Sequence, residues 1–141
     1  MNSQRARASR TRPWLCLVLV PMLALLMGAR TVPLVDPAPI LVPAGSAIKN
    51  VERSIKAALV GRQWVIGVDE PGHVVAQLNL RTHMAKIDVA YDTKVIAMKY
   101  VDSSDLLYED TKNGRVIHRN YQNWIQNLVT DISKNLQLSA P

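Results

Sequence analysis

The sequence predicts an α+β domain in which four antiparallel strands form a meander and an N-terminal and a C-terminal helix pack on one face of the sheet. Three observations predict it: apolar stripes at helical spacing near both ends of residues 46–138, period-2 alternation between them, and short turn sequences separating the alternating runs. The expected order is α-β-β-β-β-α. At 141 residues the chain is long enough for one such domain. Before residues 46–138 we expect a leader, 1–29, and a Pro-rich tether, 30–45.

Residues 1–29 have the order of a secretory leader. Four arginines and no acidic residue precede the apolar run Trp14–Met27, and the small residues Gly28 and Ala29 follow it. The run is shorter than the roughly 20 apolar residues of a membrane-spanning helix, and it contains Pro21. We therefore expect a signal peptide cleaved near Gly28 and Ala29 or, alternatively, an uncleaved signal anchor. Either would place the domain in the periplasm or at a membrane, facing the periplasm.

The tether, 30–45, contains four prolines, whose spacing excludes a helix and favours extended backbone. Its apolar content exceeds that of a free spacer, so part of it is expected to lie against the domain as an edge strand. The prolines are Pro33, Pro37, Pro39 and Pro43.

Two amphipathic helices are expected to border the strands. The first is capped by Ser46 and stopped by Gly61, and the second starts near Asn120. The apolar positions of the first are Ile48, Val51, Ile55, Ala58 and Leu59, and those of the second are Tyr121, Trp124, Ile125, Leu128, Val129, Ile132 and Leu136.

Four runs between the helices are expected to be strands joined by short turns, with one apolar face and one largely polar face. In the first run, Trp64, Ile66 and Val68 are expected to share a face. A long loop or irregular hairpin over 102–115, with a turn at Asn113-Gly114, is expected to follow. The four runs are 63–69, 73–81, 84–91 and 94–101.

Most of the net positive charge and the single cysteine lie in the leader and not in the domain. The net charge is +6, but outside residues 1–29 there are 13 Lys and Arg against 11 Asp and Glu. Because these alternate in sign instead of forming a basic face, we expect no nucleic-acid partner. The single Cys16 lies in the leader's apolar run, so residues 30–141 offer no disulfide, cysteine-based zinc site or catalytic thiol.

Several residues together resemble a known class of proteins. They are Trp64, Arg81-x-His83-x-Ala85, Tyr100-x-x-Ser103-x-x-Leu106-x-Tyr108 and Ile117-His118-Arg119-Asn120-Tyr121-x-x-Trp124-Ile125-x-x-Leu128-x-x-Asp131-Ile132. Over roughly residues 46–136 this pattern resembles small uncharacterised lipoproteins of the proteobacterial cell envelope. The resemblance implies an α+β domain on the periplasmic side of a membrane and no established activity. Ala29 stands where the lipidated cysteine of such a protein would be, so we expect no lipid on this chain.

Chemical motifs are weak. The histidines, His73, His83 and His118, do not have the spacing of a metal site, so we expect no metal or cofactor. Adjacent acidic residues, as at Asp69-Glu70 and Glu109-Asp110, point to opposite faces of a strand and make poor acid/base partners.

One group of polar and aromatic residues near a single loop remains as the candidate binding site. It is either a recognition cleft or a structural tie between the loop and the second helix. We expect a non-enzymatic binding or assembly module that recognises another envelope protein or component. The alternatives are a small ligand-binding or hydrolase-like protein that uses Ser103, Tyr108 and His118, and an immunity or inhibitor protein. The candidate residues are Tyr100, Ser103, Tyr108, His118, Asn120 and Tyr121.

Overall fold

The computed structural model describes residues 30–140. The expected leader, with its cleavage region at Gly28 and Ala29, lies outside the described residues. Within 30–140, no helix is long and apolar enough to cross a membrane.

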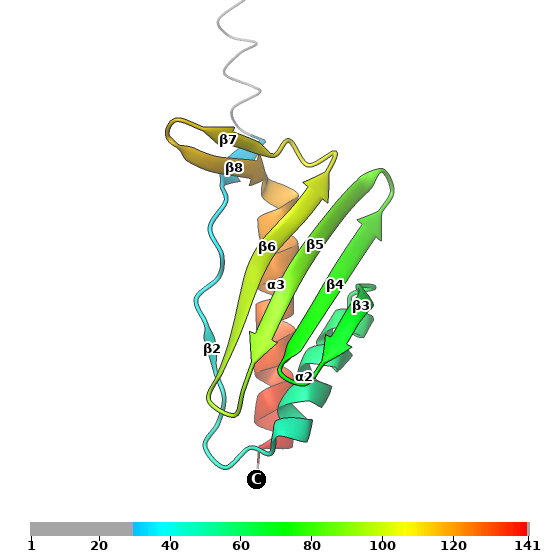
Figure 1. Ribbon diagram of the computed structural model, residues 1–141, viewed down its shortest axis with the longest axis vertical. Helices are drawn as coiled ribbons and strands as arrows, with labels where there is room; N and C mark the ends of the chain where they lie inside the picture. Colours follow the sequence, from blue (N-terminus) through cyan, green and yellow to red (C-terminus); the bar gives the residue numbers. More distant parts are fainter. Residues whose placement is uncertain (1–29, 141) are drawn as a thin grey trace, which may run out of the picture. The chain divides into compact units, whose positions relative to one another are not determined.

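The main sheet has five strands in the order β2-β6-β5-β4-β3, so the α+β class is confirmed and the four-stranded sheet is not (Figure 1). Four strands form the expected antiparallel meander: β3 (Val65–Glu70), β4 (His73–Leu80), β5 (His83–Tyr91) and β6 (Val95–Ser104). The fifth, β2 (Ile40–Leu41), pairs with β6 beyond the meander.

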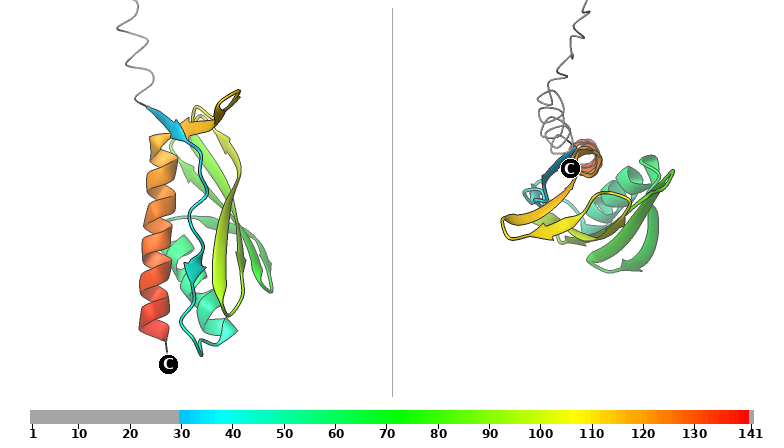
Figure 2. Two further views of the ribbon diagram at one scale, coloured as in Figure 1. Left: turned by 90° about the vertical axis from the view of Figure 1, so that its left-hand side faces the viewer. Right: turned by 90° about the horizontal axis from the view of Figure 1, so that it is seen from above.

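Two helices cover one face of this sheet, as expected: α2 (Ile48–Gly61) and α3 (Arg119–Ser139) (Figure 2). The alternation of the strands explains the arrangement, because the apolar side chains of β4, β5 and β6 are buried toward the helices. The helices are joined to each other by polar contacts, such as the bond from the Asn135 amide to the Ser54 carbonyl (3.1 Å). The core contributed by the three strands comprises Val74, Ala76, Leu78, Ala85, Ile87, Val89, Tyr91, Ile96 and Met98.

Part of the Pro-rich segment 30–45 lies against the domain and supplies edge strands, as expected for it. Its first strand, β1 (Thr31–Pro33), pairs antiparallel with β8 (Gly114–His118), and β2 pairs with β6. Between these strands the chain runs along the edge of the sheet beside α3 (Figure 2). Leu34, Ile40 and Val42 are buried in the core. The prolines keep the backbone extended, while the apolar residues between them fix it to the domain.

Of the two expectations for 102–115, a long loop or an irregular hairpin, the structure shows the hairpin, with its turn at Asn113-Gly114, after the first residues of the region complete β6. β7 (Glu109–Thr111) pairs with β8, and together with β1 they form a second sheet in the order β1-β8-β7. β8 leads without a break into α3, so the second sheet lies at the end of the domain where α3 begins (Figure 1).

Two local expectations are wrong for reasons of geometry. Ala47 is the N-cap of α2 and makes no side-chain bond, while the hydroxyl of Ser46 is buried without a hydrogen-bond partner among the described residues. In β3 the pairing with β4 shifts between Ile66 and Val68. This bulge moves Val68 off the buried face expected for it, and its side chain is 38% exposed.

Candidate functional site

The six candidate residues come from β6, β8, α3 and the segment before β7, which meet at one end of the domain. Tyr100 and Ser103 lie on β6, Tyr108 precedes β7, and His118 closes β8. Asn120 and Tyr121 occupy the first turn of α3. The structure divides them into a tyrosine cluster (Tyr100, Ser103, Tyr108 and Tyr121) and the helix cap formed by His118 and Asn120.

The tyrosine cluster is packed around the ring of Tyr100. That ring stacks on Tyr108, with centroids 5.1 Å apart, and meets Tyr121 edge to face at 5.6 Å. Its hydroxyl is 2.9 Å from the hydroxyl of Ser103. Both ring geometries are favourable arrangements for aromatic pairs. The cluster therefore joins β6, the segment before β7, and α3.

Tyr121 is the buried member of the cluster and is 2% exposed. Burial raises the pKa of its hydroxyl far above the usual value, and the negative charge of Asp36 adds to the increase. Burial also raises the pKa of Tyr100, although the hydrogen bond with Ser103 opposes this change. Both hydroxyls are therefore protonated at neutral pH.

Asp36 is a member of this region that the sequence reasoning missed. The backbone N–H of Tyr100 donates a 2.9 Å hydrogen bond to its carboxylate. This contact spans 64 residues of chain, so no local pattern indicates it.

His118 and Asn120 form the N-terminal cap of α3. The Nδ1 atom of His118 accepts a 3.1 Å hydrogen bond from the backbone N–H of Asn120, which satisfies one of the free donors of the first helical turn. In a neutral ring with this bond the proton is on Nε2. The backbone N–H of His118 also donates to the Leu106 carbonyl at 2.7 Å, which ties the β6–β7 connection to the helix start.

A second aromatic group borders the cap. The ring of His83 lies 6.4 Å from that of His118 and 6.4 Å from that of Trp124. Nδ1 of His83 lies 2.6 Å from the Asp105 carbonyl oxygen, to which it donates. His83 and Trp124 were not among the candidate residues, although both stand in the pattern that carries the family resemblance.

The hydrolase-like arrangement is not assembled in this structure. The Ser103 hydroxyl is engaged by Tyr100, whereas the acceptor nitrogen of His118 is engaged by Asn120. A serine nucleophile needs its general base within hydrogen-bond reach. Among residues 30–140, no group of three or more His, Asp or Glu side chains is placed to hold a metal ion.

We expect His118→Ala to lower the free energy of unfolding by about 1 kcal/mol, because the cap bond to Asn120 is lost. His118→Asn is the matched control, since asparagine can cap the same helix end and should restore most of the loss. Urea unfolding followed by circular dichroism measures both. Equal stability of the alanine variant and the unaltered protein would contradict a structural role for the cap.

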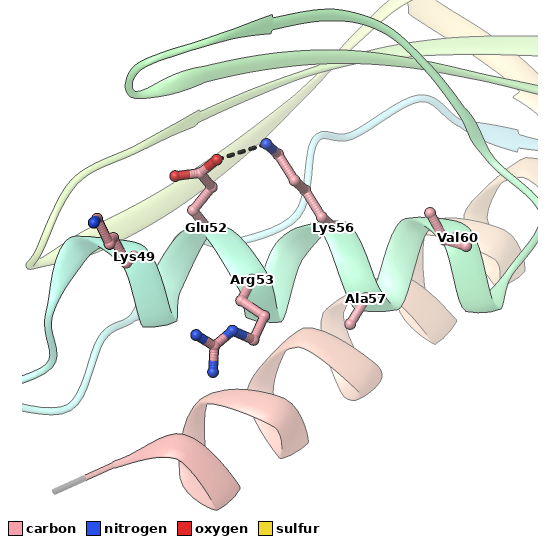
Figure 3. A pocket seen from close by; sticks show the side chains of 6 residues that line it. All are labelled: Lys49, Glu52, Arg53, Lys56, Ala57 and Val60. Atoms are coloured by element: carbon pink, nitrogen blue, oxygen red, sulfur yellow. Dashed lines mark hydrogen bonds and ion pairs between the residues drawn. The ribbon is translucent and has the colours of Figure 1, made fainter.

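Four hollows lined by described residues lie away from the tyrosine cluster. The broadest runs along the outer side of α2 and is an open strip of surface rather than an enclosed site (Figure 3). Its Lys56 pairs with Glu52 at 2.5 Å and with Asp69 at 2.6 Å, and these contacts raise the pKa of Lys56. The others lie between the Pro-rich segment and α3, on the open face near β3, and between the turn before β3, β4 and α3.

Comparisons with protein-family models, curated proteins and solved structures found no match to this chain.

Proposed function

We propose that this is an exported protein of the bacterial cell envelope, periplasmic or held at a membrane, and that its domain is a non-enzymatic module binding another envelope component. Two features support the proposal. The leader 1–29 has the order positive, apolar, small, which is typical of export signals. In the domain that follows, the Ser103 hydroxyl bonds to Tyr100 and the His118 ring bonds to Asn120, so these two candidate catalytic groups are not hydrogen-bonded to each other.

The observation that carries the non-enzymatic part is the mutual packing and hydrogen bonding of the tyrosine cluster. Tyr100 contacts Ser103, Tyr108 and Tyr121 at once, so the Ser103 hydroxyl already has a hydrogen-bond partner within a group of packed aromatic rings. A hydrogen-bonded, packed group of this kind fits a structural tie between β6 and α3. The hydrolase-like alternative has less support because the Ser103 hydroxyl would have to give up its hydrogen bond with Tyr100 and form one with His118.

Export is tested with the full chain, tagged at its C-terminus and expressed in a Gram-negative bacterium. We expect it in the periplasmic or membrane fraction, with the tag digested by protease only after the outer membrane is opened. The control variant, Leu17→Arg with Leu19→Arg, interrupts the apolar run and should remain in the cytoplasm. Cytoplasmic retention of the unaltered chain would refute export, and labelling of Ser103 by a fluorophosphonate probe would refute the non-enzymatic assignment.

A further inference from the structure

A small crevice lies between the turn that joins α2 to β3, the end of β4 and the middle of α3. Its volume is about 120 Å³, which is below the roughly 300 Å³ of common ligand pockets and suits a single ring better than a larger molecule. No candidate residue of the tyrosine cluster lines it. Its walls are formed by Arg62, Gln63, Trp64, Leu78, Leu80, Trp124 and Asn127.

The apolar part of the crevice is aromatic and aliphatic. Trp64 and Leu78 are buried, Trp124 is half-buried, and Leu80 is 39% exposed although it ends a strand whose apolar face is otherwise covered. The ring of Trp124 also lies near the ring of His83, which is not part of the crevice. Both tryptophans thus line an opening on the surface, and the half-buried Trp124 is the more accessible of the two to a ligand.

The polar part of the crevice has donors and acceptors but little net charge. Arg62 binds Asp131 through two contacts, Nε to Oδ2 at 2.6 Å and Nη2 to Oδ1 at 3.2 Å. The guanidinium holds the pKa of Asp131 below its usual value, so the pair is ionised and mutually neutralised. Guanidinium N–H groups beyond these two bonds remain as donors, and the amides of Gln63 and Asn127 offer both donors and acceptors.

Gln63 is held at the crevice by an uncommon backbone conformation. Its φ angle is +64°, in the left-handed region that few non-glycine residues adopt. Its N–H donates to the Val60 carbonyl at 3.0 Å, and the next N–H, of Trp64, donates to Leu59 at 2.9 Å. The turn after α2 therefore sets both Gln63 and Trp64 in fixed positions. Such conformations are often found where a binding site is fixed by its surroundings.

We infer that this crevice binds a neutral saccharide through one sugar ring. A sugar ring has an apolar C–H face, which suits Trp124 and Leu80, and a hydroxyl edge, which suits the neutral amides of Gln63 and Asn127 and the free N–H groups of Arg62. An anion is disfavoured because Asp131 already neutralises Arg62. This inference names a ligand class for the proposed binding module. It rests on the proposed function in one respect, that the protein meets saccharides in the cell envelope.

The test uses the full chain, with N-acetylglucosamine as the probe in isothermal titration calorimetry and in tryptophan fluorescence. We expect saturable binding, a change in fluorescence, and affinity reduced by roughly tenfold in Trp124→Ala, because a stacked ring is lost. Asn127→Ala should reduce affinity severalfold without affecting folding, since Asn127 is exposed. Gln126→Ala is the matched control, an exposed amide on the same helix that does not line the crevice.

Three results would overturn the inference. They are no binding of N-acetylglucosamine, equal affinity in the Asn127 and Gln126 variants, and binding of acetate in place of the sugar, which would assign the crevice to an anion held by Arg62. None of these depends on where the chain is located in the cell. If the chain is exported but does not bind the sugar, the saccharide inference fails and the proposed function stands. If the chain binds the sugar but stays in the cytoplasm, the export proposal fails and the saccharide inference stands.

Discussion

Replacement of Tyr121 by alanine is expected to lower the free energy of unfolding by about 3–5 kcal/mol, the usual cost of removing a buried aromatic ring. The side chain is 2% exposed and meets Tyr100 edge to face. Its loss would leave a cavity where β6 and α3 join, and Tyr100 would lose the packing that orients it toward Ser103. Urea unfolding with circular dichroism detection measures the change, provided that the transition is two-state.

Tyr121→Phe is the matched control, because it keeps the ring and removes only the hydroxyl. We expect a change below about 1 kcal/mol. The comparison decides between the two interpretations of the tyrosine cluster. A structural tie depends on the ring, whereas a recognition cleft would tolerate alanine in the melt and lose affinity for its partner. Full stability of Tyr121→Ala would therefore contradict the tie.

Replacement of Leu34 by alanine is expected to lower the free energy of unfolding by about 2–5 kcal/mol. Leu34 is 6% exposed, and its backbone N–H donates to the Arg115 carbonyl at 2.8 Å, just beyond the pairing of β1 with β8. A cavity at this position loosens the Pro-rich segment from the core. The same unfolding experiment measures the loss.

Val35→Ala is the control for this prediction, since Val35 is the next residue and is 64% exposed. We expect a change within about 0.5 kcal/mol. A small and equal effect of both substitutions would mean that residues 30–45 behave as a free tether. A large effect of Leu34→Ala alone would establish that the folded domain begins at β1.

The elements that follow from local pattern were predicted well. The stripe that runs from Tyr121 to Leu136 predicted α3, and the alternation around Ile87 and Ile96 predicted β5 and β6 with their buried faces. Both signals arise because side chains recur on one face with the period of their own backbone. The exceptions are also local: the bulge at Gly67 interrupts the period in β3, and Ala47 instead of Ser46 precedes α2.

Contacts between distant segments were not predictable in the same way. Asp36 reaches the backbone of Tyr100, and Arg62 reaches Asp131 across 69 residues. Their side chains carry no sign of a partner, because an aspartate in a loop has the same local sequence whether it faces water or a buried N–H. For the same reason the crevice of Trp64 and Trp124 was missed, although Trp124 was correctly placed on its helix; Trp64 was expected on the first strand and lies just before it.

The sequence by itself determined the α+β class, the two helices and the meander, because periodicity and composition are properties of short stretches of chain. Only the tertiary structure decided that the Pro-rich segment adds strands to both sheets, that the tyrosine rings of β6, α3 and the segment before β7 pack together, and that two tryptophans line one crevice. These depend on which distant segments pair. That choice is made by burial and hydrogen bonding summed over the whole domain, against the entropy of closing long loops.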